Sequence, residues 1–513
     1  MLGEIGLTRT QDLTPRARYL YKKNRVLNKS LRQLKVRRTL FKRSVPKGNS
    51  QESLHKALMP LQRHVADFIK SQINAIGKDP RGRRYTTEDK IMGLILHKQS
   101  GRAYRTMQKL FCLPSRKTLM ALLNRIPLGA GINDCIFQNL KINAAMLRPE
   151  ERYCVLIFDE MSLEPHINLN IRENCFEGFE NFGNGDKVII ADHAQVFMLK
   201  GLQFEWKQPV AYTFCKGTTP TIQLVRQIKE IIKKCTEIGL KIVATVSDQG
   251  ATNQAAVNYL MKHSVPQYTQ YTGRKFYFVQ NKKIIHIYDP PHLLKGIRNN
   301  LLTKNLIWET EDEKTDGKVV PQVSKEKVSR RQLCNGHTLF PKSGKDLKCC
   351  ISLTSKHKKF WIEARHNLSK MYFQSEGKND KIRPPSLRNW IVTINGLKDL
   401  YESLSKEGFS FLKPRVFNQD PVENFFGQLR QQGSRNINPT ASMFRIHFKT
   451  LLINNFVTRH SPSANCEEET SAISLVRNFV TQGIPEEQDL ILNVPDVNIP
   501  VKVFSLVDKF SVG

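Results

Sequence analysis

Short apolar runs alternate with amphipathic helical patterns between residues 154 and 289, and this order limits the possible folds more than any other feature of the chain. Runs of about four to eight apolar residues are typical of strands buried in a sheet. They lie at 154–159, 187–191, 209–214, 241–248 and 284–289. Helical patterns at 222–235 and 251–261 precede the last two runs. This order predicts a mixed α/β fold, with a sheet covered by helices.

Three carboxylates stand where such a fold would bring them together. Three strands, then helix, strand, helix and strand, is the order of an RNase H-like sheet. Asp159 lies in the first apolar run, Asp248 ends the fourth, and Glu423 lies on a later amphipathic helix over 420–432. An isolated charge in an apolar run is costly unless a metal or a partner compensates it. For each aspartate alone, capping of the next helix is an equal alternative.

Carboxylates in these places are suited to nucleic-acid hydrolysis and strand transfer. Both reactions use two Mg²⁺ (or Mn²⁺) ions, roughly 3.5–4 Å apart, held by oxygen ligands. We therefore predict that Asp159, Asp248 and Glu423 are catalytic residues and metal ligands. Strand alternation places Glu160 on the opposite face. Asp289 and His292 follow the fifth strand near the same edge, where a catalytic and a structural role are both open.

The charge of the chain indicates a partner rich in phosphates. The formal net charge is +34 over 513 residues, which favours DNA. No apolar stretch is long enough to predict a membrane span. The ten cysteines are scattered without CxxC pairs, which predicts reduced thiols without a structural zinc site.

A basic arm precedes the strand pattern, with no acidic residue from 13 to 50. Arg37 and Arg38 are its candidate DNA contacts. Leucines at helical spacing predict a helix that could pair with a second copy. An arm that orders only on DNA is the alternative, and the same basic cluster would suit nuclear import.

Three helical patterns follow at 86–97, 102–110 and 115–125, with the spacing of a helix-turn-helix. Ser115 would cap the third helix. Arg116 and Lys117 would then lie in its first turn, where a recognition helix meets DNA. Helices that only pack a small core are the alternative.

Five segments in order resemble P element transposases. They are FDEM (158–161), SDQGATN (247–253), DPPHLLKGIRNN (289–300), QDPVENFFGQLR (419–430) and NPTASMFR (438–445). The resemblance implies a nuclear cut-and-paste DNA transposase with an RNase H-like catalytic domain interrupted by a GTP-binding helical insertion. It also implies a catalytic Asp-Asp-Glu set, which falls on Asp159, Asp248 and Glu423.

The resemblance further implies GTP as a cofactor that is not hydrolysed. This prediction rests on the resemblance alone, because the chain has neither a phosphate-binding GxxxxGK[ST] motif nor an AsnLysXaaAsp guanine motif. Asp420 matches the family position that binds guanine. Lys295 and Arg298 could face the triphosphate or DNA, and a solvated basic helix face is the alternative. The implied partners are transposon ends, target DNA, GTP and further copies of the chain, with no membrane.

The expected organisation is a basic arm, a DNA-binding domain, and a catalytic domain divided by the insertion. The ranges are 1–58 for the arm, 59–148 for the helix-turn-helix-like domain, 149–294 and 414–460 for the RNase H-like domain, 295–413 for the insertion and 461–513 for the tail. The family usually begins with a zinc-containing THAP domain, but no cysteine precedes Cys112. We therefore expect that domain to be lacking, and a domesticated, catalytically silent DNA-binding derivative or repressor is the alternative function.

Deleting residues 1–58 should flatten the salt dependence of DNA binding, because each phosphate neutralised by the arm releases condensed counterions. Equilibrium binding of full-length and shortened protein to one duplex, over a series of salt concentrations, measures this slope. If both proteins lose affinity equally as salt rises, the arm makes no DNA contact.

Overall fold

The chain divides into two compact units, residues 1–84 and 85–513, which are described separately. The structure is a computed structural model. It describes residues 14–43, 58, 59, 61, 63–126, 128–171, 174–264, 275–308, 318–320, 349–432 and 437–458.

The first unit is helical. It contains α1 (Pro15–Arg43), α3 (Arg63–Ala75) and the short helix η3 (Pro80–Gly82). The helix expected in the basic arm is therefore present as α1. Leu20, Leu27 and Leu31 are exposed along it. Arg37 and Arg38 belong to α1, but their side chains lie outside the described part of the structure.

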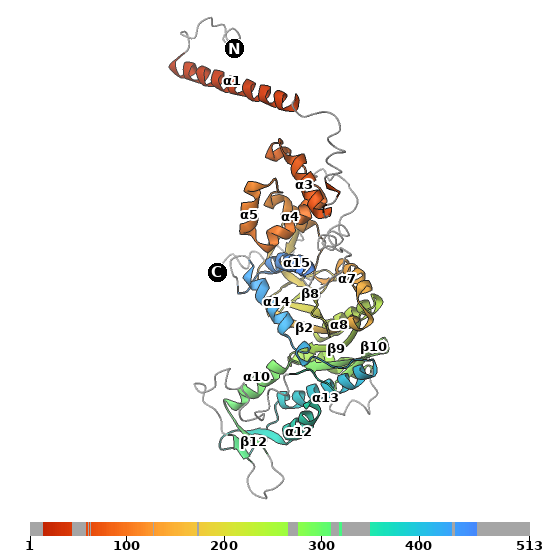
Figure 1. The fold of residues 1–513 in the computed structure, drawn as a ribbon. Coiled ribbons are helices and arrows are strands. Elements are labelled where there is room, and N and C mark those ends of the chain that lie inside the picture. Colours follow the sequence, from red (N-terminus) through yellow and green to blue (C-terminus); the bar gives the residue numbers. More distant parts are fainter. Residues whose placement is uncertain are drawn as a thin grey trace. The chain divides into compact units, whose positions relative to one another are not determined.

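A nine-stranded mixed sheet forms the centre of the second unit, in the order β10-β11-β9-β2-β7-β8-β5-β6, with β1 paired to β8 (Figure 1). The strands are β1 (Gly131–Ile132), β2 (Tyr153–Ser162), β5 (Phe179–Asn181), β6 (Asp186–Ile190), β7 (His193–Gly201), β8 (Lys207–Cys215), β9 (Lys241–Ser247), β10 (Phe276–Val279) and β11 (Lys282–Tyr288). β2, β7 and β8 are antiparallel, whereas β9 runs parallel to both β2 and β11. A separate hairpin pairs β3 (Asn168–Asn170) with β4 (Cys175–Glu177).

The position of the predicted second strand in the sheet differs from that expected for three consecutive hairpin strands. The run 187–191 does form a strand, β6, but it lies at the edge of the sheet, with Val188 and Ile189 exposed by 53% and 41%. The antiparallel neighbour of β2 is β7, which the sequence pattern missed. A β-branched run gives a strong strand signal whether it is central or at an edge, so propensity alone does not place it in the sheet.

Helices cover the sheet. α8 (Thr221–Glu237) and α9 (Ala251–Lys262) pack on each other, and α8 also contacts β9. α14 (Asp420–Gln431) packs on β2 and β7, and α15 (Ala441–Thr458) packs on β8. An aromatic cluster holds α15 there, since the ring centroid of Tyr212 lies 5.3 Å from Phe444 and 4.6 Å from Phe448.

The three predicted helices near the start of this unit are α4 (Thr87–Gln99), α5 (Gly101–Leu110) and α6 (Arg116–Arg125). The Ser115 hydroxyl accepts a hydrogen bond from Thr118 N at 3.2 Å, which is the predicted cap. Arg116 and Lys117 are exposed in the first turn of α6. α4 contacts α15, and Lys98 Nζ donates to Thr450 Oγ1 at 2.8 Å.

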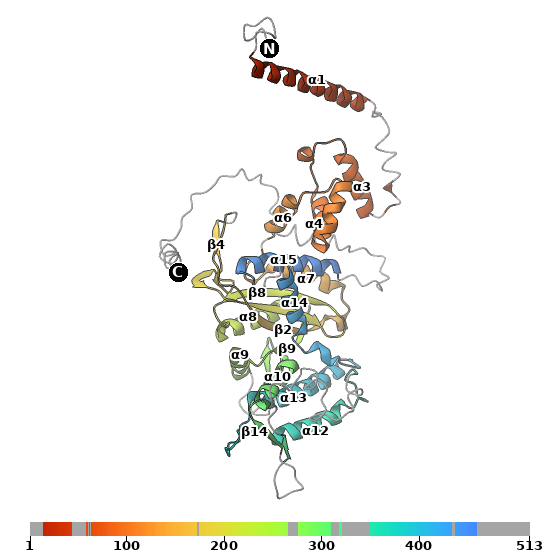
Figure 2. The same cartoon turned by 90° about the vertical axis from the view of Figure 1, so that its left-hand side faces the viewer.

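The insertion leaves the sheet after β11 and returns before α14. Its elements are α10 (Pro290–Leu301), β12 (Asn305–Trp308), β13 (Lys318–Val320), α12 (His357–Lys370), β14 (Met371–Gln374) and α13 (Pro385–Lys406). In both views it lies on the β9 side of the sheet, away from α15 (Figure 2). A helical insertion was expected. The insertion also contains a small sheet, in which β12 pairs with β13 and β14. Among the described helices, none combines the length and apolar character needed to cross a membrane.

Candidate functional site

The strand register brings two of the predicted carboxylates to the same end of the sheet. β2 and β9 are parallel, and Ile157 pairs with Val246. Continuing this register by two residues on each strand leads to Asp159 and Asp248. Glu423 lies in the first turn of α14, the helix that packs on β2.

Asp159 is the most perturbed member of the group. The pKa of its carboxyl group is raised to about 7, mainly by burial and also by the negative charges of Asp248 and Glu423. A hydrogen bond from Glu160 N, at 2.9 Å from Asp159 Oδ1, and the nearby His292 lower the pKa in the opposite direction. The charges of Asp248 and Glu423 therefore act on Asp159 and make its ionisation less favourable.

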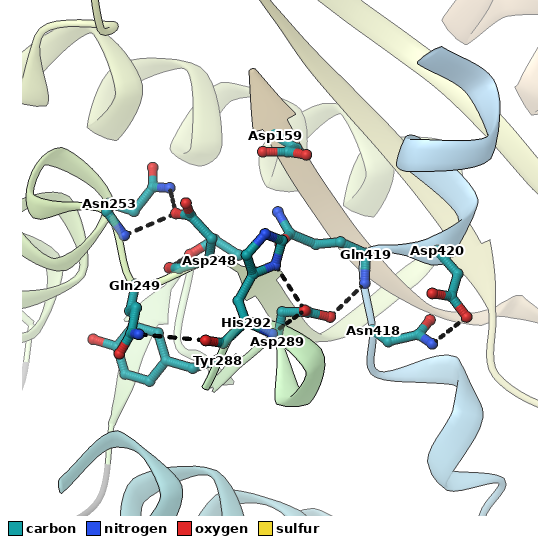
Figure 3. Close-up of polar contacts among 12 residues, drawn as sticks. Asp159, Asp248, Gln249, Asn253, Tyr288, Asp289, His292, Asn418, Gln419 and Asp420 are labelled. Carbon is teal, nitrogen blue, oxygen red and sulfur yellow. Dashed lines mark hydrogen bonds and ion pairs between the residues drawn. The ribbon is translucent and has the colours of Figure 1, made fainter. Parts of the chain in front are cut away.

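Asp248 also shapes the start of the next helix. Its Oδ1 accepts hydrogen bonds from Gly250 N at 2.9 Å and from Asn253 Nδ2 at 2.6 Å. These contacts hold the carboxylate in one orientation where β9 turns into α9 (Figure 3). The sequence left open whether Asp248 has a local role at the start of the next helix. Its hydrogen bonds show that it does, and they hold in place the carboxylate whose charge acts on Asp159. Asn253 was not singled out in the sequence.

Glu160 points away from this group, as strand alternation predicts. Its Oε1 accepts a hydrogen bond from Thr219 N at 2.8 Å, on the other side of the sheet. Glu160 therefore has a partner of its own.

The donor chemistry of the three carboxylates suits a divalent cation. Mg²⁺ prefers carboxylate oxygens and usually keeps several water or phosphate ligands. Repulsion between buried negative charges, seen at Asp159, is what a cation relieves. Within the part of the chain that is described, no three Asp, Glu, His or Cys side chains come close enough to hold an ion by themselves. Further oxygen ligands from a nucleic-acid phosphate and water would be needed.

A buried polar group connects the carboxylates to the insertion. Asp289 is 1% exposed and precedes α10. It accepts hydrogen bonds from His292 Nδ1 at 2.9 Å and from Gln419 N at 2.8 Å (Figure 3). The bond to Asp289 raises the pKa of His292, as do the charges of Asp248 and Asp159. Gln419 was missed in the sequence, because only its place in the fold distinguishes it from other glutamines.

The predicted nucleotide residues do not share one pocket. Asp420 lines a pocket of about 420 Å³ beside the β7–β8 turn, with Lys200, Lys413 and Arg415. Its Oδ2 accepts a hydrogen bond from Asn418 Nδ2 at 2.6 Å. The lining of this pocket does not include Lys295, which is exposed on α10, or Arg298, whose guanidinium donates to Asn299.

Comparisons with known proteins agree with this architecture. The model of the TNP-like, RNase H N-terminal domain matches residues 128–261, and that of the TNP-like, RNase H C-terminal domain matches residues 416–449. The transposable element P transposase of Drosophila melanogaster is 25% identical over 447 residues, which cover 75% of this chain and 56% of that protein. The chain thus spans little more than half the length of this curated relative.

A solved Drosophila P element transposase strand transfer complex shares the fold. Its TM-score is 0.57 at 20% sequence identity, and the match covers 79% of this chain and 98% of that chain. The chain is therefore similar in sequence and in fold to P element-type transposases, and two of its segments match the two halves of a TNP-like RNase H domain.

Proposed function

We propose that the protein is a DNA transposase that cleaves transposon ends and joins them to target DNA in a metal-dependent reaction. The observation that carries the proposal is the raised pKa of Asp159, caused by burial and by Asp248 and Glu423. Bringing buried negative charges together is unfavourable in free energy. Such groups are typical of sites that bind a cation and a phosphate. DNA, further copies of the chain and a nuclear location are part of the same proposal.

In this proposal Asp159, Asp248 and Glu423 hold Mg²⁺ or Mn²⁺. Bound divalent ions stabilise the attacking and leaving oxygens of an in-line phosphoryl displacement. Asp248 is held in place by Gly250 and Asn253, so little reorganisation is needed when DNA binds. The exposed Arg116 and Lys117 of α6, and Arg37 and Arg38 of α1, contact DNA phosphates and keep the substrate in place.

Replacing Asp159, Asp248 or Glu423 by Ala should lower cleavage of terminal-repeat DNA by at least about 10²-fold, as loss of a group that stabilises transition-state charge typically does. DNA binding should change little, because it depends on the basic surfaces. Calcium should support binding but not cutting, since its coordination is longer and looser. Mapping of nicks with purified protein, magnesium and GTP measures the effect.

Glu160→Gln is the matched control, because this side chain adjoins Asp159 in sequence but bonds Thr219 on the other face. It should retain cleavage. If the wild-type protein binds the DNA and makes no nick under any metal, the chain is instead a catalytically silent DNA-binding derivative.

We further propose that GTP binds as a cofactor that is not hydrolysed, with Asp420 accepting hydrogen bonds from the guanine N–H groups. The support is the family position of Asp420 and its place at a pocket with polar and cationic walls. Guanine would take the place of Asn418 at the carboxylate. Lys295 and Arg298 then remain candidates for the triphosphate from the α10 side.

Asp420→Asn should reduce the preference for GTP over ATP, because one acceptor becomes a mismatched donor. Loss of such a matched pair costs about tenfold or more in selectivity. Equilibrium binding of labelled nucleotides measures it. Glu205→Gln, which removes a negative charge from the same pocket, is the control. Equal selectivity in wild type and the Asp420 variant would remove Asp420 from the site.

A further inference from the structure

A buried hydrogen-bonded link joins the insertion to the helix that carries Glu423. Asp289 follows β11 and caps α10, and its Oδ2 accepts from His292 N at 3.0 Å and from His292 Nδ1 at 2.9 Å. Its other oxygen, Oδ1, accepts from Gln419 N at 2.8 Å. Both oxygens of a nearly inaccessible carboxylate are therefore used, and they connect segments 130 residues apart in sequence.

Gln419 continues the link to the first strand. Its side chain is fully buried, and its Nε2 donates to Phe158 O at 3.0 Å, next to Asp159. Its own carbonyl oxygen accepts from Glu423 N at 3.0 Å. One residue thus bonds the strand that carries Asp159 and the helix turn that carries Glu423. The separation of these two carboxylates depends on where Gln419 is held.

The loop of Asp248 is tied to the same part of the insertion. Gln249 lies against α10, where a Cβ added at Gly296 would come within 2.7 Å of Gln249 Nε2. A Cβ at this position would force the end of the Gln249 side chain to move. Asn389 Nδ2, on α13, donates to Gln249 Oε1 at 3.4 Å. The insertion therefore contacts Gln249, which follows Asp248 in the chain, and through Asp289 it contacts Gln419.

We propose that Asp289 and Gln419 are positioning residues, which set the place of Glu423 relative to Asp159 and make the metal affinity of the site depend on the position of α10. This inference rests on the proposed metal-dependent function. Neither residue touches the reacting atoms. Groups that orient metal ligands typically change metal affinity by about 10–100-fold when they are removed.

Asp289→Ala removes the acceptor of Gln419 N–H, so amide exchange in the 418–426 segment should accelerate by about tenfold without any metal, as expected for a lost buried hydrogen bond. In the same protein, Mn²⁺ binding should weaken by about 10–100-fold. Asp289→Asn should recover part of both effects, because its Oδ1 can still accept from Gln419 N, whereas its Nδ2 would face the backbone N–H of His292 and lose that hydrogen bond.

Gln419→Leu provides a second variant that keeps the backbone N–H and removes only the bond to Phe158 O. It should also weaken Mn²⁺ binding. Gln208→Leu is the matched control, since Gln208 is equally buried in β8 and donates to a backbone oxygen there. Its Mn²⁺ affinity should equal that of wild type.

Unchanged exchange at 418–426 in Asp289→Ala would overturn the link, and unchanged Mn²⁺ affinity in Asp289→Ala and Gln419→Leu would overturn the positioning role. If Asp289→Asn loses Mn²⁺ as completely as Asp289→Ala, the charge at Asp289 binds metal directly and the assignment is wrong. A wild-type protein that binds no Mn²⁺ would refute the proposed function instead, and amide exchange would still decide whether the link exists.

Discussion

The parallel pairing of β2 with β9 is the constraint on which the rest of the site depends. It brings Asp159, which lies within β2, to the same part of the sheet as Asp248, which directly follows β9. α14 then adds Glu423 from the helix layer. The unfavourable free energy of burying this carboxylate near two others is reflected in the raised pKa of Asp159. Without metal, the folded protein keeps this proton to about pH 7, whereas the unfolded chain releases it near 3.8. Stability therefore declines as the pH rises between these values.

The insertion is built into the central sheet rather than appended to it. Thr393 Oγ1 of α13 accepts from Tyr288 N at 3.1 Å and donates to Tyr288 O at 3.2 Å, at the end of β11. Asp289 and Gln249 add contacts on either side of the carboxylates. A ligand that moves the insertion would therefore act on the site through hydrogen bonds. This offers a physical route by which a nucleotide could affect DNA chemistry without being consumed.

Much of the fold could be predicted from the sequence because the apolar runs and caps are local signals. The helix after Ser115 begins where this capping side chain predicts. The order of strands within the sheet was harder, because β6 and β7 are both good strand formers and only tertiary contacts decide which is central. At the site, the carboxylates could be named from their place in the pattern. Gln419 could not, since its role follows from a contact with Asp289 that no spacing reveals.

Manganese binding measured across pH tests the central claim that the carboxylates near Asp159 form a cation site. Because the carboxyl group must lose its proton before it binds metal, affinity should rise by about tenfold between pH 6 and pH 8 and level off above about pH 8. Asp159→Asn should bind weakly and show no such rise. An affinity that is constant over this range, or equal in wild type and the Asn variant, would contradict the account.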